Sequence, residues 1–189
     1  MNRTPLHELP AVEPCHADRT RLILMRHAKS DYPIGVGDHD RPLSERGRSD
    51  ARAAAQWIAH QGEALLGAQP MILVSSAVRT QQTWTIVSTG AGLDPRTDSR
   101  TEERLYEATD SVYLDVLREG LLESATVMVI GHNPATEAAA RMLAADVDSD
   151  AYHAMMRRFP TSAIAVIDLD AELLSPGQGI LQAYVIPRG

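Results

Sequence analysis

The sequence contains a single cysteine, Cys15, and no long run of apolar residues. One cysteine excludes an internal disulfide and a cysteine-rich metal site, and it suits a protein of a reducing compartment. No window is apolar enough to cross a bilayer, and residues 1–19, with three prolines, lack the apolar segment of a secretion signal. We therefore expect a cytoplasmic protein in which a flexible tail, residues 1–19, precedes one domain, residues 20–189.

Positive charge is also scarce. The chain has 18 lysines and arginines against 25 aspartates and glutamates, which gives a formal net charge of -7. Such a chain has no general electrostatic attraction for nucleic acid or for an anionic membrane, so neither is an expected partner. An anionic substrate would therefore need a pocket in which positive charge is concentrated. With 189 residues, 44% of them hydrophobic, the chain is long enough to bury the core of one globular domain.

Short apolar runs alternate with segments of helical periodicity. The expected strands cover residues 21–25, 71–76, 125–132, 162–169 and 181–186. The first three are apolar almost throughout, which is typical of strands that are covered on both faces. The expected helices cover residues 44–62, 80–92, 111–121 and 135–145. This alternation predicts an α/β fold, a three-layer sandwich with a mostly parallel central sheet flanked by helices.

Polar side chains follow the first three expected strands at the points where these strands end. They are two arginines and two histidines: Arg26, His27, Arg79 and His132. Because sheets of this kind place their sites at the carboxyl ends of the strands, we expect the four side chains to converge at one edge. A lone histidine after a strand is usually an ordinary polar loop residue. Four such side chains at equivalent positions indicate a functional site.

The residue types at this edge favour phosphate. Arginines bind planar oxyanions through several hydrogen bonds, and two of them in one pocket would repel a divalent cation. The histidines have no acidic or cysteine partner at ligand spacing, so no metal site is expected. One histidine can attack phosphorus as a neutral imidazole while the other stabilises charge on a nonbridging oxygen. Arg26 beside His27 disfavours protonation of that ring, which keeps it nucleophilic.

Four motifs occur in a characteristic order: LMRHAKS, SSAVRTQQT, LYEA and VIGHNP. Together they resemble the histidine phosphatase superfamily, and within it the SixA-like phosphohistidine phosphatase branch, over about residues 22–168. The resemblance implies a phosphoglycerate mutase-like fold, a phosphohistidine enzyme intermediate and no cofactor. By position it implies His27 as the nucleophile, Arg26 and Arg79 as phosphate ligands and His132 as the second histidine of the phosphate pocket.

The first motif departs from the RHGE pattern of many family members, since Ala28 and Lys29 follow the histidine. This departure is typical of the SixA-like branch, and it leaves Ser30 as a further hydrogen-bond donor for phosphate. The segment DHDRPLSERGRSDA also resembles this branch. Its His39, between two aspartates, is expected to be solvated, and Arg41 is expected at a solvated helix entry rather than on phosphate.

The proton donor is less well defined by the sequence. The segment TEERLYEA offers Glu102, Glu103 and Glu107. Alignment with the mutase pattern N-E-R-H-Y favours Glu103, whereas Glu107 lies in the LYEA segment of the SixA-like branch, and a solvated surface run is the alternative for all three. An imidazole, with an intrinsic pKa of ~6.5, can leave from an already protonated ring, whereas an alkoxide needs a proton. A phosphohistidine substrate would therefore tolerate a poor or absent acid.

We therefore expect a metal-independent phosphatase that works through a phosphohistidine intermediate and removes phosphate from phosphohistidine in proteins. The expected partner is a histidine-phosphorylated protein domain. A chain of 189 residues leaves little room for the large inserted lid of longer members, which favours a protein substrate. Two alternatives remain open: a phosphatase of small phosphomonoesters, and a noncatalytic module that binds phosphate or a phosphoprotein.

Overall fold

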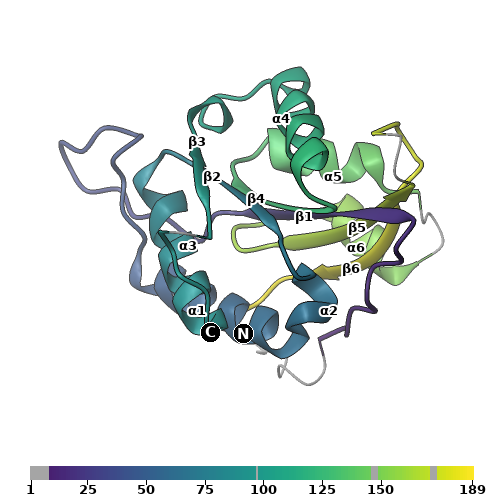
Figure 1. The fold of residues 1–189 in the computed structure, drawn as a ribbon. Coiled ribbons are helices and arrows are strands. Elements are labelled where there is room, and N and C mark those ends of the chain that lie inside the picture. The colour runs from purple at the N-terminus through teal and green to yellow at the C-terminus, as the bar shows by residue number, and fades with distance from the viewer. Residues whose placement is uncertain (1–8, 97, 146–148, 171–173) are drawn as a thin grey trace.

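The computed structural model describes residues 9–96, 98–145, 149–170 and 174–189. Its strands are β1 (Arg19–Arg26), β2 (Met71–Ser75), β3 (Arg100–Glu102), β4 (Thr126–Gly131), β5 (Ile164–Asp170) and β6 (Ile180–Val185). They form one six-stranded sheet in the order β3-β2-β4-β1-β5-β6 (Figure 1). The pairs among β3, β2, β4 and β1 are parallel, and β5 is antiparallel to both of its neighbours. The predicted α/β fold with a mostly parallel sheet is confirmed.

Helices cover both faces of this sheet (Figure 1). They are α1 (Glu45–Gln61), α2 (Glu63–Leu66), α3 (Val78–Ala91), the 3-10 turn η2 (Glu103–Leu105), α4 (Asp110–Glu123), α5 (Ala135–Leu143) and α6 (Asp150–Arg157). The four helices expected from the sequence are present with small differences at their ends. Among the described residues, no helix is both long and apolar enough to span a bilayer.

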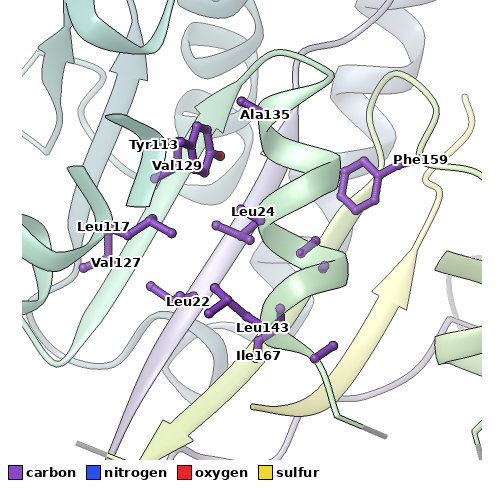
Figure 2. Close-up of a cluster of buried hydrophobic side chains, with 14 of the residues drawn as sticks. Leu22, Leu24, Tyr113, Leu117, Val127, Val129, Ala135, Leu143, Phe159 and Ile167 are labelled. Carbon is purple, nitrogen blue, oxygen red and sulfur yellow. The ribbon is translucent and has the colours of Figure 1, made fainter. Parts of the chain in front are cut away.

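The central strand β1 explains the two layers of core. Successive side chains of a strand point to opposite faces, and all four apolar residues from Leu22 to Met25 are fully buried. Leu22 and Leu24 belong to a cluster that includes Leu143 of α5, which Figure 2 shows. Ile23 and Met25 belong to the cluster on the other face, which contains the two tryptophans of α1 and α3. The near-continuous apolar run therefore fills both layers.

The start of α1 fixes the backbone of the first motif. The Ser44 side chain accepts a hydrogen bond from the Gly47 backbone N–H and so caps the start of the helix. The Ser44 backbone N–H and hydroxyl both donate to the Lys29 carbonyl, at 2.9 and 3.0 Å. Gly47 lies so close to this carbonyl that a Cβ atom there would collide with the Lys29 backbone. Helix and motif are thus held together through backbone contacts.

Part of the N-terminal leader packs against the domain. Val12 is buried, and its backbone N–H donates to Oε1 of Gln61 at 2.9 Å. The indole N–H of Trp57 donates to the carbonyl of Pro10 at 3.1 Å. Residues 9–13 therefore differ from the flexible tail expected for the whole leader, because apolar residues among them cover one face of the core. The first eight residues lie outside the described residues.

Candidate active site

The register of the central strands brings the two predicted histidines together. Arg26, the last residue of β1, pairs with Gly131, the last residue of β4. The residues that follow them, His27 and His132, are therefore neighbours, with ring centroids 5.0 Å apart. The backbone N–H of His27 also donates to the Gly131 carbonyl at 3.0 Å. The parallel pairing of β1 and β4 thus places both rings at the carboxyl end of the sheet.

A cavity of about 350 Å³ lies over this end of the sheet. It contains six of the seven predicted site residues: Arg26, His27, Ser30, Arg79, Glu107 and His132. The other lining residues are Lys29, Tyr32, Asp38, Arg41, Tyr106, Asn133 and Thr161. Among the described residues, histidine, cysteine, aspartate and glutamate side chains form no group of three or more that suits a metal ion.

His27 is held in the tautomer that suits a nucleophile. Its Nδ1 lies 2.7 Å from the carbonyl oxygen of Ala28. Because a carbonyl oxygen only accepts, Nδ1 carries the hydrogen, and in the neutral ring Nε2 keeps the free lone pair. Burial lowers the pKa of His27 to about 3, and the nearby charges of His132, Arg79 and Arg26 act in the same direction. The ring is therefore neutral near pH 7, with burial contributing more than the adjacent arginine.

His132 is held through its other ring nitrogen. Its Nε2 lies 2.8 Å from the hydroxyl of Ser75, at the end of β2. Its Nδ1 is buried and has no hydrogen-bond partner among the described residues. Burial, with a second contribution from Arg79, lowers the pKa of His132 to about 4. If Nε2 accepts from Ser75, Nδ1 carries the hydrogen and can donate it to an oxyanion in the cavity.

Both predicted arginines keep unused donors in this cavity. Nη1 of Arg26 donates to the Phe159 carbonyl at 2.9 Å, while its Nε has no partner among the described residues. Arg79 donates from Nη1 to the carbonyl of Asp38 at 2.6 Å and from Nη2 to its carboxylate at 3.1 Å, and its Nε is likewise without a partner. Buried donors of this kind are normally satisfied, so the cavity is suited to an oxyanion.

The unsatisfied buried atoms of the described residues concentrate here. Ten buried side-chain nitrogen or oxygen atoms lack a partner, and six of them belong to residues that line this cavity. The five residues that carry them are Arg26, Arg41, Arg79, His132 and Asn133. Four of these six atoms are guanidinium nitrogens, which can only donate hydrogen bonds.

Two residues of the loop before α1 belong to the site, although the sequence did not indicate it. Arg41 lines the cavity and pairs with Asp38 at 2.9 Å, and its side chain is only 12% exposed. The expected solvated helix entry is therefore wrong for Arg41, because Asp38 and the ring of Tyr32 hold it over the cavity. Asp38 also accepts from the Tyr106 hydroxyl at 2.9 Å. Only tertiary contacts reveal this network.

The carboxylate of Asp38 stays ionised. Burial acts against the charged form, but the hydrogen bond from Tyr106 and the charges of Arg79 and Arg41 outweigh it, so the pKa of Asp38 lies below its usual range. An acid with a lowered pKa holds no proton near pH 7. Asp38 therefore positions the two arginines and is poorly suited to protonate a leaving group.

The structure separates the candidate acids. Glu107 lines the cavity, with an exposed side chain. Glu103 is exposed and does not line it, because the turn η2 points Leu105 into the core and Glu103 toward solvent. Glu102 pairs with Arg104 at 2.9 Å. His39, expected to be solvated, is instead half-exposed, and its Nε2 lies 3.1 Å from the hydroxyl of Ser76.

Comparison with known proteins agrees with this geometry. A family model of the histidine phosphatase superfamily (branch 1) matches residues 22–125. An uncharacterized protein of Mycobacterium tuberculosis is 37% identical over 168 residues, which cover 87% of this chain and 100% of that protein. The chain belongs to the histidine phosphatase superfamily. It is therefore a phosphatase with a histidine nucleophile, which decides against a noncatalytic binding module.

Solved structures identify the branch of this histidine phosphatase. A Nakamurella multipartitia protein provisionally named phosphohistidine phosphatase SixA has a TM-score of 0.73 and 28% identity, and the match covers 90% of this chain and 98% of that chain. The SixA-like branch and the phosphoglycerate mutase-like fold are thus confirmed. A shorter match joins the chain to glucosyl-3-phosphoglycerate phosphatase of Mycobacterium tuberculosis, with 40% identity over 88 residues that cover 44% of this chain and 36% of that enzyme.

Proposed function

We propose that this phosphatase removes the phosphoryl group from phosphohistidine in proteins, with His27 as the nucleophile. The observation that carries the proposal is the composition of the cavity. It offers a neutral His27 with a free Nε2 and several unused donors, but of its two carboxylates Asp38 stays ionised and Glu107 is exposed to solvent. Such a site suits a leaving group that does not depend on a positioned acid.

In the first step, Nε2 of His27 attacks phosphorus and the bond from phosphorus to the substrate imidazole breaks. If the substrate ring is already protonated on its other nitrogen, it leaves as a neutral imidazole and needs no proton from the enzyme. Arg26, Arg79 and His132 donate hydrogen bonds to the nonbridging oxygens, and Ser30, buried in the cavity wall, is a further donor.

In the second step, water attacks the phosphorus of phospho-His27, and the bond to Nε2 breaks to release inorganic phosphate. The bond from Nδ1 to the Ala28 carbonyl keeps the ring in one orientation through both steps. The same arginines neutralise the developing charge in each step, because it forms on the same three oxygens.

A cytoplasmic location also remains a proposal, based on the single cysteine of the sequence.

One observation favours small phosphomonoesters as the second candidate. Glu107 lines the cavity, and an alkoxide leaving group would need an acid at this place. The partial similarity to glucosyl-3-phosphoglycerate phosphatase points in the same direction. The two candidates differ in the leaving group and share the nucleophile.

A direct test compares phosphate release from a histidine-phosphorylated protein and from a phosphomonoester, using wild type, Glu107→Gln and the control Glu103→Gln. We expect wild type to prefer the phosphohistidine, and both variants to retain that rate within about twofold. Preference for the ester, together with a Glu107→Gln defect that grows as the leaving group becomes poorer, would instead establish the small-ester phosphatase. The Glu103→Gln control separates an acid in the cavity from a general effect of lost surface charge.

A further inference from the structure

Exposed apolar side chains gather on one loop beside the cavity. Six large apolar side chains are prominently exposed among the described residues, and three of them lie within five residues of each other. They are Tyr32, Ile34 and Val36, with exposed fractions of 68%, 104% and 39%. Figure 1 shows the loop between β1 and α1 projecting from the body of the domain. We refer to residues 32–36 as the apolar loop.

The two ends of this loop are fixed to the phosphate site. The backbone N–H of Asp31 donates to the Pro42 carbonyl at 2.8 Å. The guanidinium of Arg41 lies 4.0 Å from the centre of the Tyr32 ring. On the other side of the loop tip, Asp38 holds Arg79. Because Tyr32 and Asp38 both line the cavity, the projecting tip between them begins and ends beside it.

The tip itself contributes little to the fold. Ile34 is fully exposed, and a Cβ atom added at Gly35 would have no atom within 4 Å. Gly35 has a φ of +80°, which lets the chain turn sharply there. Scattered exposed apolar residues are ordinary, as with Leu122 on α4, but several on one projecting loop mark an interaction site.

We propose that the apolar loop is the docking surface for the folded protein that carries the phosphohistidine, and this proposal rests on the proposed function. An imidazole ring is one methylene away from its backbone. A phosphohistidine can therefore reach Nε2 of His27 only if the surface of its own protein comes to the mouth of the cavity. That surface would contact Ile34 and Val36, so we infer a partner with apolar side chains next to its phosphohistidine.

This arrangement separates recognition from chemistry. The loop ends orient the arginines, through Asp38 and Tyr32, while the tip is free to contact a partner. A small substrate would fill the cavity without touching the tip, whereas a protein substrate would bury it. Ile34 and Val36 should therefore affect the KM for a protein substrate and leave small substrates unaffected.

The experiment uses the double variant Ile34→Ser/Val36→Ser, with Leu122→Ser as the control. Leu122 is 87% exposed on α4, so its substitution removes a similar amount of exposed apolar surface outside the loop. Each protein is assayed on a histidine-containing phosphotransfer domain phosphorylated with phosphoramidate, and on the free amino acid phosphohistidine. We expect kcat/KM for the protein substrate to fall about tenfold in the double variant, mainly through KM, and to remain unchanged in the control.

The free amino acid distinguishes the outcomes. Rates on it should stay within about twofold for every variant, because neither residue of the double variant lines the cavity. Equal losses on both substrates, or no loss on either, would overturn the docking surface. Absence of wild-type activity on the phosphorylated domain, with activity on esters, would overturn the proposed function itself, and that outcome is recognised before any variant is compared.

Discussion

Arg21 and Arg26 lie five residues apart on β1, yet the structure uses them in opposite ways. Arg21 is fully buried, and its guanidinium binds both oxygens of Asp168, at 2.7 and 2.8 Å, and the carbonyls of Ala64 and Glu13. The Arg26 guanidinium makes one hydrogen bond, to the Phe159 carbonyl, and keeps a buried Nε without a partner among the described residues. An arginine whose donors are bonded within the protein stabilises the fold, whereas an arginine with unused donors is available to a ligand.

The difference between the two ends of β1 extends beyond these arginines. At the Arg21 end, the charge of the guanidinium is matched by a bidentate carboxylate. At the Arg26 end, unused donors of Arg79 and His132 surround the same cavity. The two ends of β1 therefore serve different purposes, and substitutions can disrupt the site without disrupting the fold.

The largest effect is expected at the nucleophile. His27→Ala removes the group that accepts the phosphoryl, so turnover should fall by on the order of 10⁴-fold or more. The measurement is phosphate release under saturating substrate, with circular dichroism to verify folding. His60→Ala, at an exposed position on α1, is the matched control and should keep wild-type turnover. A His27→Ala rate within tenfold of wild type would contradict the assignment.

The next effect concerns the opposite end of β1. Asp168→Asn leaves the buried charge of Arg21 without its partner, so the free energy of unfolding should fall by about 3–5 kcal/mol. Urea denaturation measures this loss, and turnover of the folded variant should match wild type. Asp170→Asn is the control, because Asp170 is 73% exposed in its pair with Arg19 and its loss should cost less than about 1 kcal/mol. Equal losses of unfolding free energy in the two variants would show that the buried pair of Arg21 and Asp168 stabilises the fold no more than the exposed pair.

A smaller effect is expected for Arg26→Lys. Lysine keeps the charge but loses the planar fork of donors, so kcat/KM should fall about tenfold to a hundredfold. The melting temperature should change little, since the Arg26 side chain has a single hydrogen bond to the rest of the protein among the described residues. Arg118→Lys, in an exposed pair with Asp115, is the control for both measurements. A large loss of stability with intact kcat/KM would make Arg26 a structural residue like Arg21.

The smallest effect is a pH dependence of stability. The pKa of His27 is about 3 in the folded protein, against an ordinary 6.5. Between these values the unfolded chain binds the extra proton, so the free energy of unfolding falls as pH drops below 6.5. His27→Gln has no such group to protonate. Between pH 7.5 and pH 5.5 its free energy of unfolding should therefore fall by about 1 kcal/mol less than that of wild type. If the free energies of unfolding of the two proteins differed by the same amount at both pH values, the result would contradict a neutral, buried His27.

Much of the fold could be predicted because β1, β4 and β5 consist largely of buried apolar residues. The short elements could not. The strand β3 is three polar residues at the edge of the sheet, and α6 has only eight residues, so both are too short for a periodic apolar pattern to stand out. Their positions depend on neighbouring elements rather than on local sequence.

The residues of the candidate site also fall into two groups, those that the sequence could predict and those that it could not. Arg26, His27 and His132 stand at ends of strands, which topology alone brings to one edge, so they could be predicted to converge. Asp38 and Arg41 lie on a loop whose position depends on distant partners, Arg79 and Tyr106 among them, and no local pattern predicts those contacts.

The central claim is that the phosphoryl group passes through Nε2 of His27, in a cavity whose free donors receive it. The most direct test mixes the enzyme with a radiolabelled phosphohistidine protein, quenches in alkali within one turnover and maps the label by peptide analysis. We predict a label on His27, and none on the His27→Ala variant. Label on His132 instead, or steady phosphate release with no labelled enzyme at any time, would contradict the account.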